Sequence, residues 1–330
     1  MKKAFILFCI AVWPGLAGAA AGSFPPQATA AEFAAWQSET RAWLGEALYN
    51  GPAPEAVPLA PTFGAREQRD NYELTEVTIQ DRPGHATSGL LARPLNPPAA
   101  KLPLVIALHG HGGRAHDLFD PDNELYFYGD LLARQGYIVF APNIDHSSLE
   151  HTQSFLGFGP LPRHVTFPAM GQRVWMVRRA LDFMLTQPDV DPDRIGVVGL
   201  SNGGMTTMFV AAMDTRVTLA VASGSLIMHD RMWRREILHC RCQYLDRLDG
   251  QLDYYDVFAL VAPRYLLVQS GEKDPIFPIG SANKAFAHIQ EAYNIAGFPD
   301  RVAHDVHPGA HVFSAPVPEQ WFHQYLPLPP

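Results

Sequence analysis

Residues 195–204, which read IGVVGLSNGG, decide the fold of this chain. The stretch begins with an unbroken apolar run, as in a strand that is covered on both faces. A helical pattern starts at Asn202, so Ser201 lies between a strand and a helix. A turn this sharp strains the backbone of the serine, and side chains at the flanking glycine positions would clash. The stretch therefore predicts a buried strand, a tight turn that presents Ser201, and a helix.

Outward from this stretch, apolar runs of strand length alternate with segments of helical spacing. Strands are expected at residues 72–80, 88–93, 102–108, 137–141, 195–200, 219–222, 265–269 and 302–306. Helices are expected at residues 125–135, 171–186, 202–213, 281–296 and 318–325. Because parallel strands need crossover connections, this alternation predicts an α/β fold with a mostly parallel central sheet, led by an antiparallel pair and flanked by helices on both faces. Ligands bind such sheets at the carboxyl ends of the strands.

Residues 22–70 are expected to form an N-terminal extension to a catalytic domain at residues 71–330. Apolar residues at helical spacing, with charges between them, predict a helix at Ala30–Tyr49. A proline-rich link follows, and proline continues neither a helix nor a strand. Its prolines are Pro52, Pro54, Pro58 and Pro61.

Residues 1–21 have the pattern of a secretory signal peptide. Lys2 and Lys3 precede an uncharged apolar run, and small residues with A-x-A spacing predict cleavage near residues 19–22. The run is too short to cross a bilayer, which takes about 20 apolar residues. We therefore expect an exported protein, periplasmic or extracellular, without stable membrane insertion.

The formal net charge is −8, and the leader carries two of the lysines. An acidic chain argues against nucleic acid as a partner, since phosphate binding needs clustered Lys and Arg. The cysteines beyond the leader are Cys240 and Cys242. We therefore expect a core held by packing rather than by a disulfide framework. The oligomeric state is left open.

A serine hydroxyl is a weak nucleophile and needs a base, which in turn needs an orienting acid. Asp274 follows the strand expected at residues 265–269, where such an acid would lie. Glu272 is the rival candidate, and an aspartate before a proline is also common in simple turns. The order of the motifs along the chain favours Asp274 as the acid.

The base is expected after the last strand, in the sequence HPGAHVF at residues 307–313. His311 lies beyond the Pro-Gly pair, on a loop able to reach back over the sheet. His307 directly follows the strand and can instead cap the turn. We favour His311 as the general base.

The loop HGHGG, residues 109–113, follows the strand expected at residues 102–108. Its glycines let the main chain approach a substrate. The backbone amides of His111 and Asn202 are expected to hold the oxyanion of the reaction. His109 is expected to be a hydrogen-bonded loop residue, with substrate contact as its second interpretation.

These pieces together resemble the α/β-hydrolases of the dienelactone hydrolase, acetyl xylan esterase and prolyl oligopeptidase-like group. HGHGG, GLSNGG, SGEKDPIFP and HPGAHVF stand where that group has its oxyanion loop, nucleophile, acid and histidine, and the similarity covers about residues 72–325. The resemblance implies the α/β-hydrolase fold and an acyl hydrolase that needs no cofactor. Dienelactone hydrolases carry cysteine where this chain has Ser201, which argues against lactone chemistry.

Residues 225–262 follow a strand and are expected to cover the active site. Trp233 and Tyr244 are candidate substrate contacts, although core packing is the commoner role of such residues. Cys240 and Cys242 allow three interpretations: a strained disulfide, two buried thiols or a metal-binding pair.

Two further groups of residues are expected to be structural. His109 and His111 resemble a metal-binding pair, but no motif completes a zinc site, so we expect no catalytic metal. Three arginines are expected on a solvated or salt-bridged helix face: Arg173, Arg178 and Arg179.

The sequence thus predicts an exported serine hydrolase that cleaves carboxylic esters through Ser201, His311 and Asp274. A short-acyl ester, with an acetylated carbohydrate as first candidate, is the expected small-molecule or carbohydrate substrate. The alternatives are a serine peptidase of the prolyl oligopeptidase-like type, a metal-dependent hydrolase and a non-catalytic binding protein.

Overall fold

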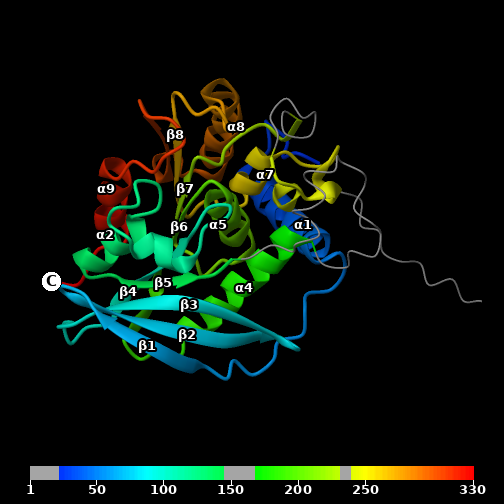
Figure 1. The fold of residues 1–330 in the computed structure, drawn as a ribbon. Helices are drawn as coiled ribbons and strands as arrows, with labels where there is room; N and C mark the ends of the chain where they lie inside the picture. The colour runs from blue at the N-terminus through cyan, green and yellow to red at the C-terminus, as the bar shows by residue number, and fades with distance from the viewer. Residues whose placement is uncertain (1–21, 145–167, 231–238) are drawn as a thin grey trace, which may run out of the picture.

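The structure, a computed structural model, describes residues 22–144, 168–230 and 239–330. At its centre is a nine-stranded sheet with the order β1-β2-β3-β5-β4-β6-β7-β8-β9 (Figure 1). The strands are β1 (Thr62–Gln68), β2 (Tyr72–Arg82), β3 (His85–Pro94), β4 (Leu102–Leu108), β5 (Ile138–Pro142), β6 (Val190–Leu200), β7 (Leu219–Ser223), β8 (Tyr265–Gly271) and β9 (Val302–His307).

The direction of the strands divides the sheet in two. β1, β2, β3 and β5 pair with one another in antiparallel fashion, and the pairs from β5 through β4 to β9 are parallel. A two-residue turn joins β2 to β3, with Gly84 at a φ of 71° that favours glycine. The expected α/β fold, with its leading antiparallel pair and mostly parallel sheet, is confirmed.

Side chains alternate across the sheet and form two hydrophobic cores. In β4, Leu104 and Ile106 belong to one core, whereas Val105 and Ala107 belong to the other. On the first face lie α1 (Ala30–Tyr49), α4 (Ala169–Met184), α5 (Asn202–Met213), α7 (Tyr254–Ala259) and α8 (Ile279–Ala296). On the second lie α2 (Tyr128–Gln135) and α9 (Pro316–Tyr325) (Figure 1).

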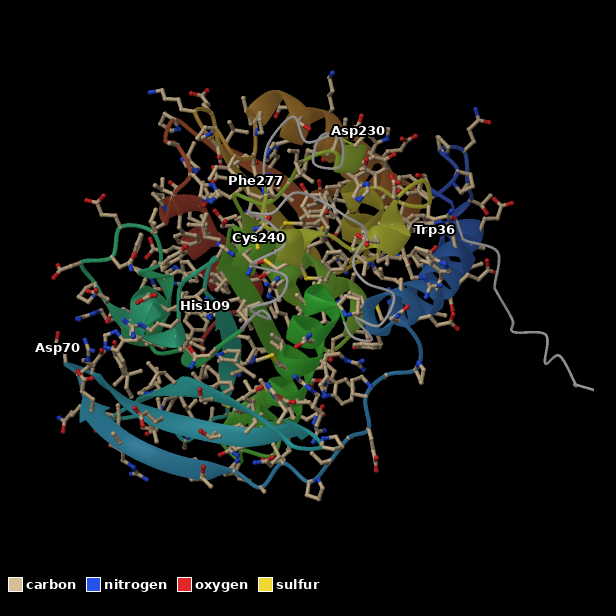
Figure 2. The ribbon with its side chains drawn as sticks, turned by 45° about the vertical axis from the view of Figure 1, so that its right-hand side comes forward. Trp36, Asp70, His109, Asp230, Cys240 and Phe277 are labelled. Atoms are coloured by element: carbon tan, nitrogen blue, oxygen red, sulfur yellow. The ribbon has the colours of Figure 1, made fainter. Side chains whose placement is uncertain are left out.

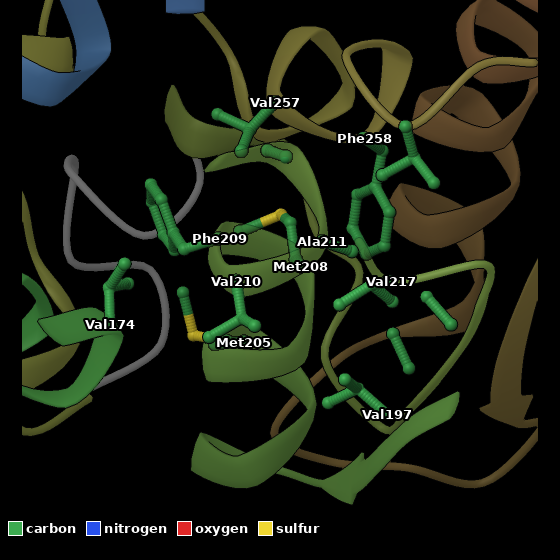
Figure 3. Packing of buried hydrophobic residues seen from close by; sticks show 14 of the residues in the cluster. Val174, Val197, Met205, Met208, Phe209, Val210, Ala211, Val217, Val257 and Phe258 are labelled. Atoms are coloured by element: carbon green, nitrogen blue, oxygen red, sulfur yellow. The ribbon is translucent and has the colours of Figure 1, made fainter. Parts of the chain in front are cut away.

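Helix α5 is the most enclosed of these helices and starts directly after Ser201. Figure 3 shows Met208 and Phe209 of α5 packed near Val257 and Phe258 of α7. All four side chains are fully buried. Ser201, the expected nucleophile, therefore lies at the N-terminus of a helix that is packed in the core.

The N-terminal segment contributes to this same fold. Helix α1 begins at the expected residue, because Thr29 and Glu32 form a capping box before it. Phe33 of α1 is buried in the first core. Strand β1 was not expected: all of its residues are exposed, so no alternation of apolar residues marks it as a strand. The domain boundary expected at residue 70 stays a prediction.

The leader expected at residues 1–21 lies outside the described residues. Across residues 22–144, 168–230 and 239–330, no helix has the length and apolar character that a membrane crossing requires.

Candidate active site

Ser201 lies in a tight turn between β6 and α5, with a φ of 62° and a ψ of −122°. A positive φ strains a residue that carries a Cβ atom, and the Ser201 amide donates to the carbonyl of Ser223 on β7 at 2.9 Å. A Cβ atom at Gly199 would collide with the backbone of Gly203, and one at Gly203 with the carbonyl oxygen of Leu108. The expected strand, turn and helix are confirmed, and the glycines are required because backbone fills the space around them.

Asp274 and His311 form a hydrogen-bonded pair beyond the carboxyl ends of β8 and β9. His311 Nδ1 lies 2.7 Å from Asp274 Oδ2. The other carboxylate oxygen accepts the amides of Ile276 at 2.8 Å and Phe277 at 3.0 Å. Burial raises the pKa of Asp274. The hydrogen bond from His311, the positive charge of that ring when it is protonated, and the two amides outweigh burial, so that the pKa of Asp274 is lowered overall. Because a carboxylate only accepts, Nδ1 of His311 carries the proton and Nε2 is left as the acceptor.

The two rival candidates have other surroundings. Glu272 is exposed to solvent. His307 is buried, and its Nδ1 accepts the amide of Gly309 at 3.2 Å, so it caps the turn after β9. The geometry thus joins His311 to Asp274.

Gly224, just after β7, brings the imidazole of His311 to the serine turn. A Cβ atom at Gly224 would stand 2.9 Å from Leu200 Cδ1 and 3.1 Å from His311 Cε1. The ring therefore lies beside the residue that precedes Ser201. Phe277 stacks on the same ring, with centroids 5.7 Å apart. The histidine is held between the acid loop and the turn that presents the serine.

The loop after β4 is closed by a turn in which the Gly113 amide donates to the Gly110 carbonyl at 3.2 Å. Gly112 has a φ of 76° at the third position, the conformation that a type II turn needs there. His109 is buried, and its Nε2 accepts the Ile144 amide at 3.0 Å. His109 thus has the loop-anchoring hydrogen bond that we expected. The oxyanion role of the His111 and Asn202 amides stays a prediction.

Tyr128 on α2 links this loop to the serine turn, a role that no sequence pattern predicted. Its buried hydroxyl donates to the carbonyl of Leu108 at 2.6 Å and accepts the amide of Leu200 at 3.2 Å. The ends of β4 and β6 are thereby fixed relative to each other. Burial raises the pKa of Tyr128 well above its usual value, so the hydroxyl keeps the proton that it donates.

Arg173 on α4 corrects our expectation of a solvated helix face. Its side chain is fully buried, and Nη1 donates to Asn202 Oδ1 at 2.9 Å and to the Cys242 carbonyl at 3.0 Å. No carboxylate among the described residues pairs with it. Arg178 and Arg179 do form ion pairs, with Asp214 and Asp182. Helical spacing placed all three arginines on one face, but the turn of the helix directs Arg173 under the serine.

In the segment expected to cover the site, the described residue His239 lies beside the acid loop. His239 packs edge-on against Phe277 with ring centroids 4.8 Å apart, and its Nε2 lies 3.1 Å from the Ile276 carbonyl. In the view of Figure 2, the labels of Phe277, Cys240 and His109 lie one below another in the middle part of the molecule. Tyr244 is buried in the first core, and Trp233 lies outside the described residues. Their roles as substrate contacts stay predictions.

Comparison with known proteins supports the same class of fold. A family model described as glucuronyl esterase of fungi matches residues 163–244. A Bacillus subtilis protein named as a hydrolase, YtaP, is 26% identical over 270 residues, which are 76% of this chain and 86% of that protein.

Two solved structures share the architecture. A Bacteroides fragilis protein described as an acetyl xylan esterase has a TM-score of 0.70 at 20% identity, and the match covers 87% of this chain and 78% of that one. A glucuronoyl esterase from Solibacter usitatus has a TM-score of 0.68 at 18% identity, covering 92% of this chain and 95% of that one. The chain has the α/β-hydrolase fold. Its structural neighbours include proteins described as esterases of carbohydrates.

Proposed function

We propose that this protein is a serine hydrolase that cleaves carboxylic esters of carbohydrates, with Ser201 as nucleophile. The site carries the proposal: a strained serine at the start of α5, and a His311–Asp274 pair 2.7 Å apart on the loops after β8 and β9. The esterase descriptions of the matching family model and of the structural neighbours support the substrate class.

The reaction transfers the acyl group of the ester to Ser201 and then to water. Ser201 Oγ attacks the ester carbonyl while His311 Nε2 takes its proton and Asp274 holds the ring through Nδ1. The amides of His111 and Asn202 donate to the oxyanion, and the first amides of a helix are suited to this because they have no acceptor within the helix. His311 then returns the proton to the leaving alcohol, and water releases the acyl group by the same path.

Two classes of carbohydrate ester differ in which partner is the sugar. In an acetylated xylan the sugar is the alcohol, whereas in a glucuronoyl ester the sugar supplies the acyl group. The neighbours include proteins named for each class. An acetyl ester is the simpler substrate, because a short acyl group makes the smallest demand on the pocket.

The test is hydrolysis by the purified chain of p-nitrophenyl acetate to octanoate, acetylated xylan and a glucuronate methyl ester. Ser201→Ala is the inactive variant, and Ser88→Ala, an exposed serine on β3, is the matched control. We expect wild type and Ser88→Ala to cleave at least one carbohydrate ester and Ser201→Ala to fall to background. A serine-directed phosphonate should add one label, at Ser201.

Other outcomes would assign the alternatives. Cleavage of aminoacyl amides in preference to every ester would indicate a peptidase. Activity that survives the phosphonate but not a chelator would indicate a metal hydrolase. A wild type that binds these carbohydrates but turns over none of them would indicate a binding protein.

Export is part of the proposal and rests on residues 1–21. Expression of the full chain in a bacterium should yield periplasmic or secreted protein whose N-terminus, read by mass spectrometry, lies near residues 19–22. An intact Met1 in the cytoplasmic fraction would refute export without affecting the proposed chemistry.

A further inference from the structure

Three soft or borderline metal ligands converge next to the candidate oxyanion loop. A nitrogen of His111 and the sulfur atoms of Cys240 and Cys242 all lie within 4.8 Å of one another. His111 comes from the turn after β4, and the cysteines flank the start of a short 3-10 helix, η2 (Arg241–Gln243). Residues more than a hundred positions apart in sequence thus bring ligand atoms to one point.

The distances between these ligand atoms are close to those between the ligand atoms around a bound zinc ion. Zn²⁺ takes thiolate sulfur at about 2.3 Å and imidazole nitrogen at about 2.0 Å in tetrahedral sites, which puts neighbouring ligand atoms about 3.5–3.8 Å apart. Ligand atoms within 4.8 Å of one another reach that spacing through shifts of about 1 Å. Neither cysteine sulfur belongs to a disulfide, so both can bind a metal as thiolates.

The surrounding contacts hold the cysteine backbone in place. The amide of Gln243 donates to the Cys240 carbonyl at 3.0 Å, which closes the turn between the two cysteines. Arg173 donates to the Cys242 carbonyl at 3.0 Å, and the Gln243 side chain lies 2.8 Å from His239 Nδ1. The turn that carries the sulfur atoms is therefore fixed by contacts to Arg173 and to His239.

The group is accessible to a cation that enters from solvent. Cys242 is buried, whereas Cys240 and His111 are half-buried, so the group is open on one side. Arg173 lies beneath it, and no carboxylate among the described residues pairs with that guanidinium. A site with two thiolates and one divalent cation has no net charge, so it adds no positive charge beside Arg173.

We propose that His111, Cys240 and Cys242 bind one thiophilic cation, of which Zn²⁺ is the probe, and that this ion ties the loop after β4 to the turn at η2. Thiolate and imidazole ligands select zinc or cuprous copper over calcium or magnesium. On binding, each thiol loses its proton to solvent as its sulfur takes up the metal, and the His111 ring binds through a neutral nitrogen. No cysteine is oxidised in this step. Our sequence expectation of no metal site concerned a catalytic zinc, and this site is distinct from the triad.

The test is Zn²⁺ binding to the full mature chain, reduced and kept free of oxygen, measured by competition with a chromophoric chelator. All proteins also carry Ser201→Ala, so that binding is read independently of any esterase activity. The variants are Cys240→Ser, Cys242→Ser and His111→Gln. His116→Gln is the matched control, because His116 is an exposed histidine of the same stretch outside the group.

We expect one Zn²⁺ per chain and a loss of affinity of about 100-fold or more in each cysteine variant, since even outer contacts of a metal ligand contribute about 10–100-fold. His116→Gln should stay near wild type. Co²⁺ should give the absorption band of thiolate-to-metal charge transfer. For a cysteine variant that does not fold, protection of the wild-type thiols from iodoacetamide by Zn²⁺ gives the same information.

Three results would overturn the proposal. The first is no stoichiometric binding to the reduced wild type. The second is equal affinity in the folded cysteine variants, which would place the ion elsewhere in a chain that has 14 histidines. The third is a Cys240–Cys242 disulfide that persists in the purified protein and resists mild reduction, which would make the pair a covalent clamp instead.

Discussion

Replacing Arg173 by methionine would separate the stability of the fold from the geometry of the candidate active site. Arg173 is fully buried beneath the serine turn and holds the side chain of Asn202, whose amide is the proposed oxyanion donor. Methionine keeps the length and the apolar stem of the side chain but has no donor. The substitution therefore removes the contact to Asn202 without opening a large cavity.

The effect on stability is the difference between opposing contributions. With described residues the guanidinium makes two hydrogen bonds, to Asn202 and to the Cys242 carbonyl, and bonds from a charged donor contribute about 1.5–3 kcal/mol each. Against this, burying a cation costs several kcal/mol, and no carboxylate among the described residues pairs with this one. The two nearly cancel, so we expect the free energy of unfolding to change by less than about 2 kcal/mol.

The effect on catalysis has no such compensation. Losing one oxyanion donor costs about 10²–10³ in turnover, and a 1 Å misplacement can cost about 10²-fold. Arg173→Met leaves the Asn202 amide in place but frees its side chain. We therefore expect kcat to fall by about 10–100-fold with little change in KM. Arg173→Lys, which keeps a charged donor, should recover part of the loss.

The assay combines p-nitrophenyl acetate kinetics with urea unfolding of the same preparations. Arg178→Met is the matched control, since Arg178 is on the same helix, is part-exposed and pairs with Asp214 at 3.5 Å. We expect this control to keep its kcat. An Arg173→Met variant with wild-type kcat would refute the positioning role. A loss of more than about 4 kcal/mol in the free energy of unfolding would refute the near-cancellation of the stability contributions, because the buried charge would then be strongly stabilising.

Three other predictions follow from the site and the fold. Asp274→Asn should keep its circular dichroism spectrum but lose about 10⁴-fold in kcat, because the amide no longer holds the correct tautomer of His311. A loss in kcat below about tenfold would remove Asp274 from the triad. Gly203→Ala should lower the melting temperature or abolish soluble expression, because its Cβ atom meets the carbonyl oxygens of Leu108 and His109; an unchanged melting temperature would contradict the close approach. Burial lowers the pKa of His304 from 6.5 to about 4. Its contribution to the free energy of unfolding is therefore complete above pH 6.5 and is lost as the pH falls towards 4. The loss is at most about 3 kcal/mol. His304→Gln should lack this part of the pH dependence in urea unfolding, and identical slopes in the two proteins would refute it.

The sequence was sufficient for the parallel part of the sheet because its strands are buried on both faces. β4 and α5 have the predicted bounds. An unbroken apolar run defines the whole of β4, and the glycines around Ser201 define the start of α5. The exposed strand β1 and the six-residue helix α7 were missed. Neither has enough residues on one buried face to produce a period, and tertiary contacts determine both.

The candidate triad was accessible to sequence reasoning because each member follows a strand in a fixed order. Tyr128 and Arg173 were not accessible in this way. Each lies on a helix with ordinary spacing, and its role depends on which polar atom lies across the core from it. A buried tyrosine hydroxyl needs a partner, but the sequence alone does not show that Tyr128 is buried. No signal in the sequence distinguished Arg173 from its neighbours Arg178 and Arg179.

These two residues also explain how the turn at Ser201 stays strained. A residue held at a positive φ costs about 1–3 kcal/mol and persists only when its surroundings fix it from several sides. Here Tyr128 holds the amide before the serine, Arg173 holds the side chain after it, and Ser223 accepts the amide of the serine itself. Each contact comes from a different element, so no single local motif accounts for the turn. The strain that aims Ser201 at the substrate is thus maintained by the packing of the whole sheet and its helices, and that is why the serine turn stands at the centre of the fold rather than on a surface loop.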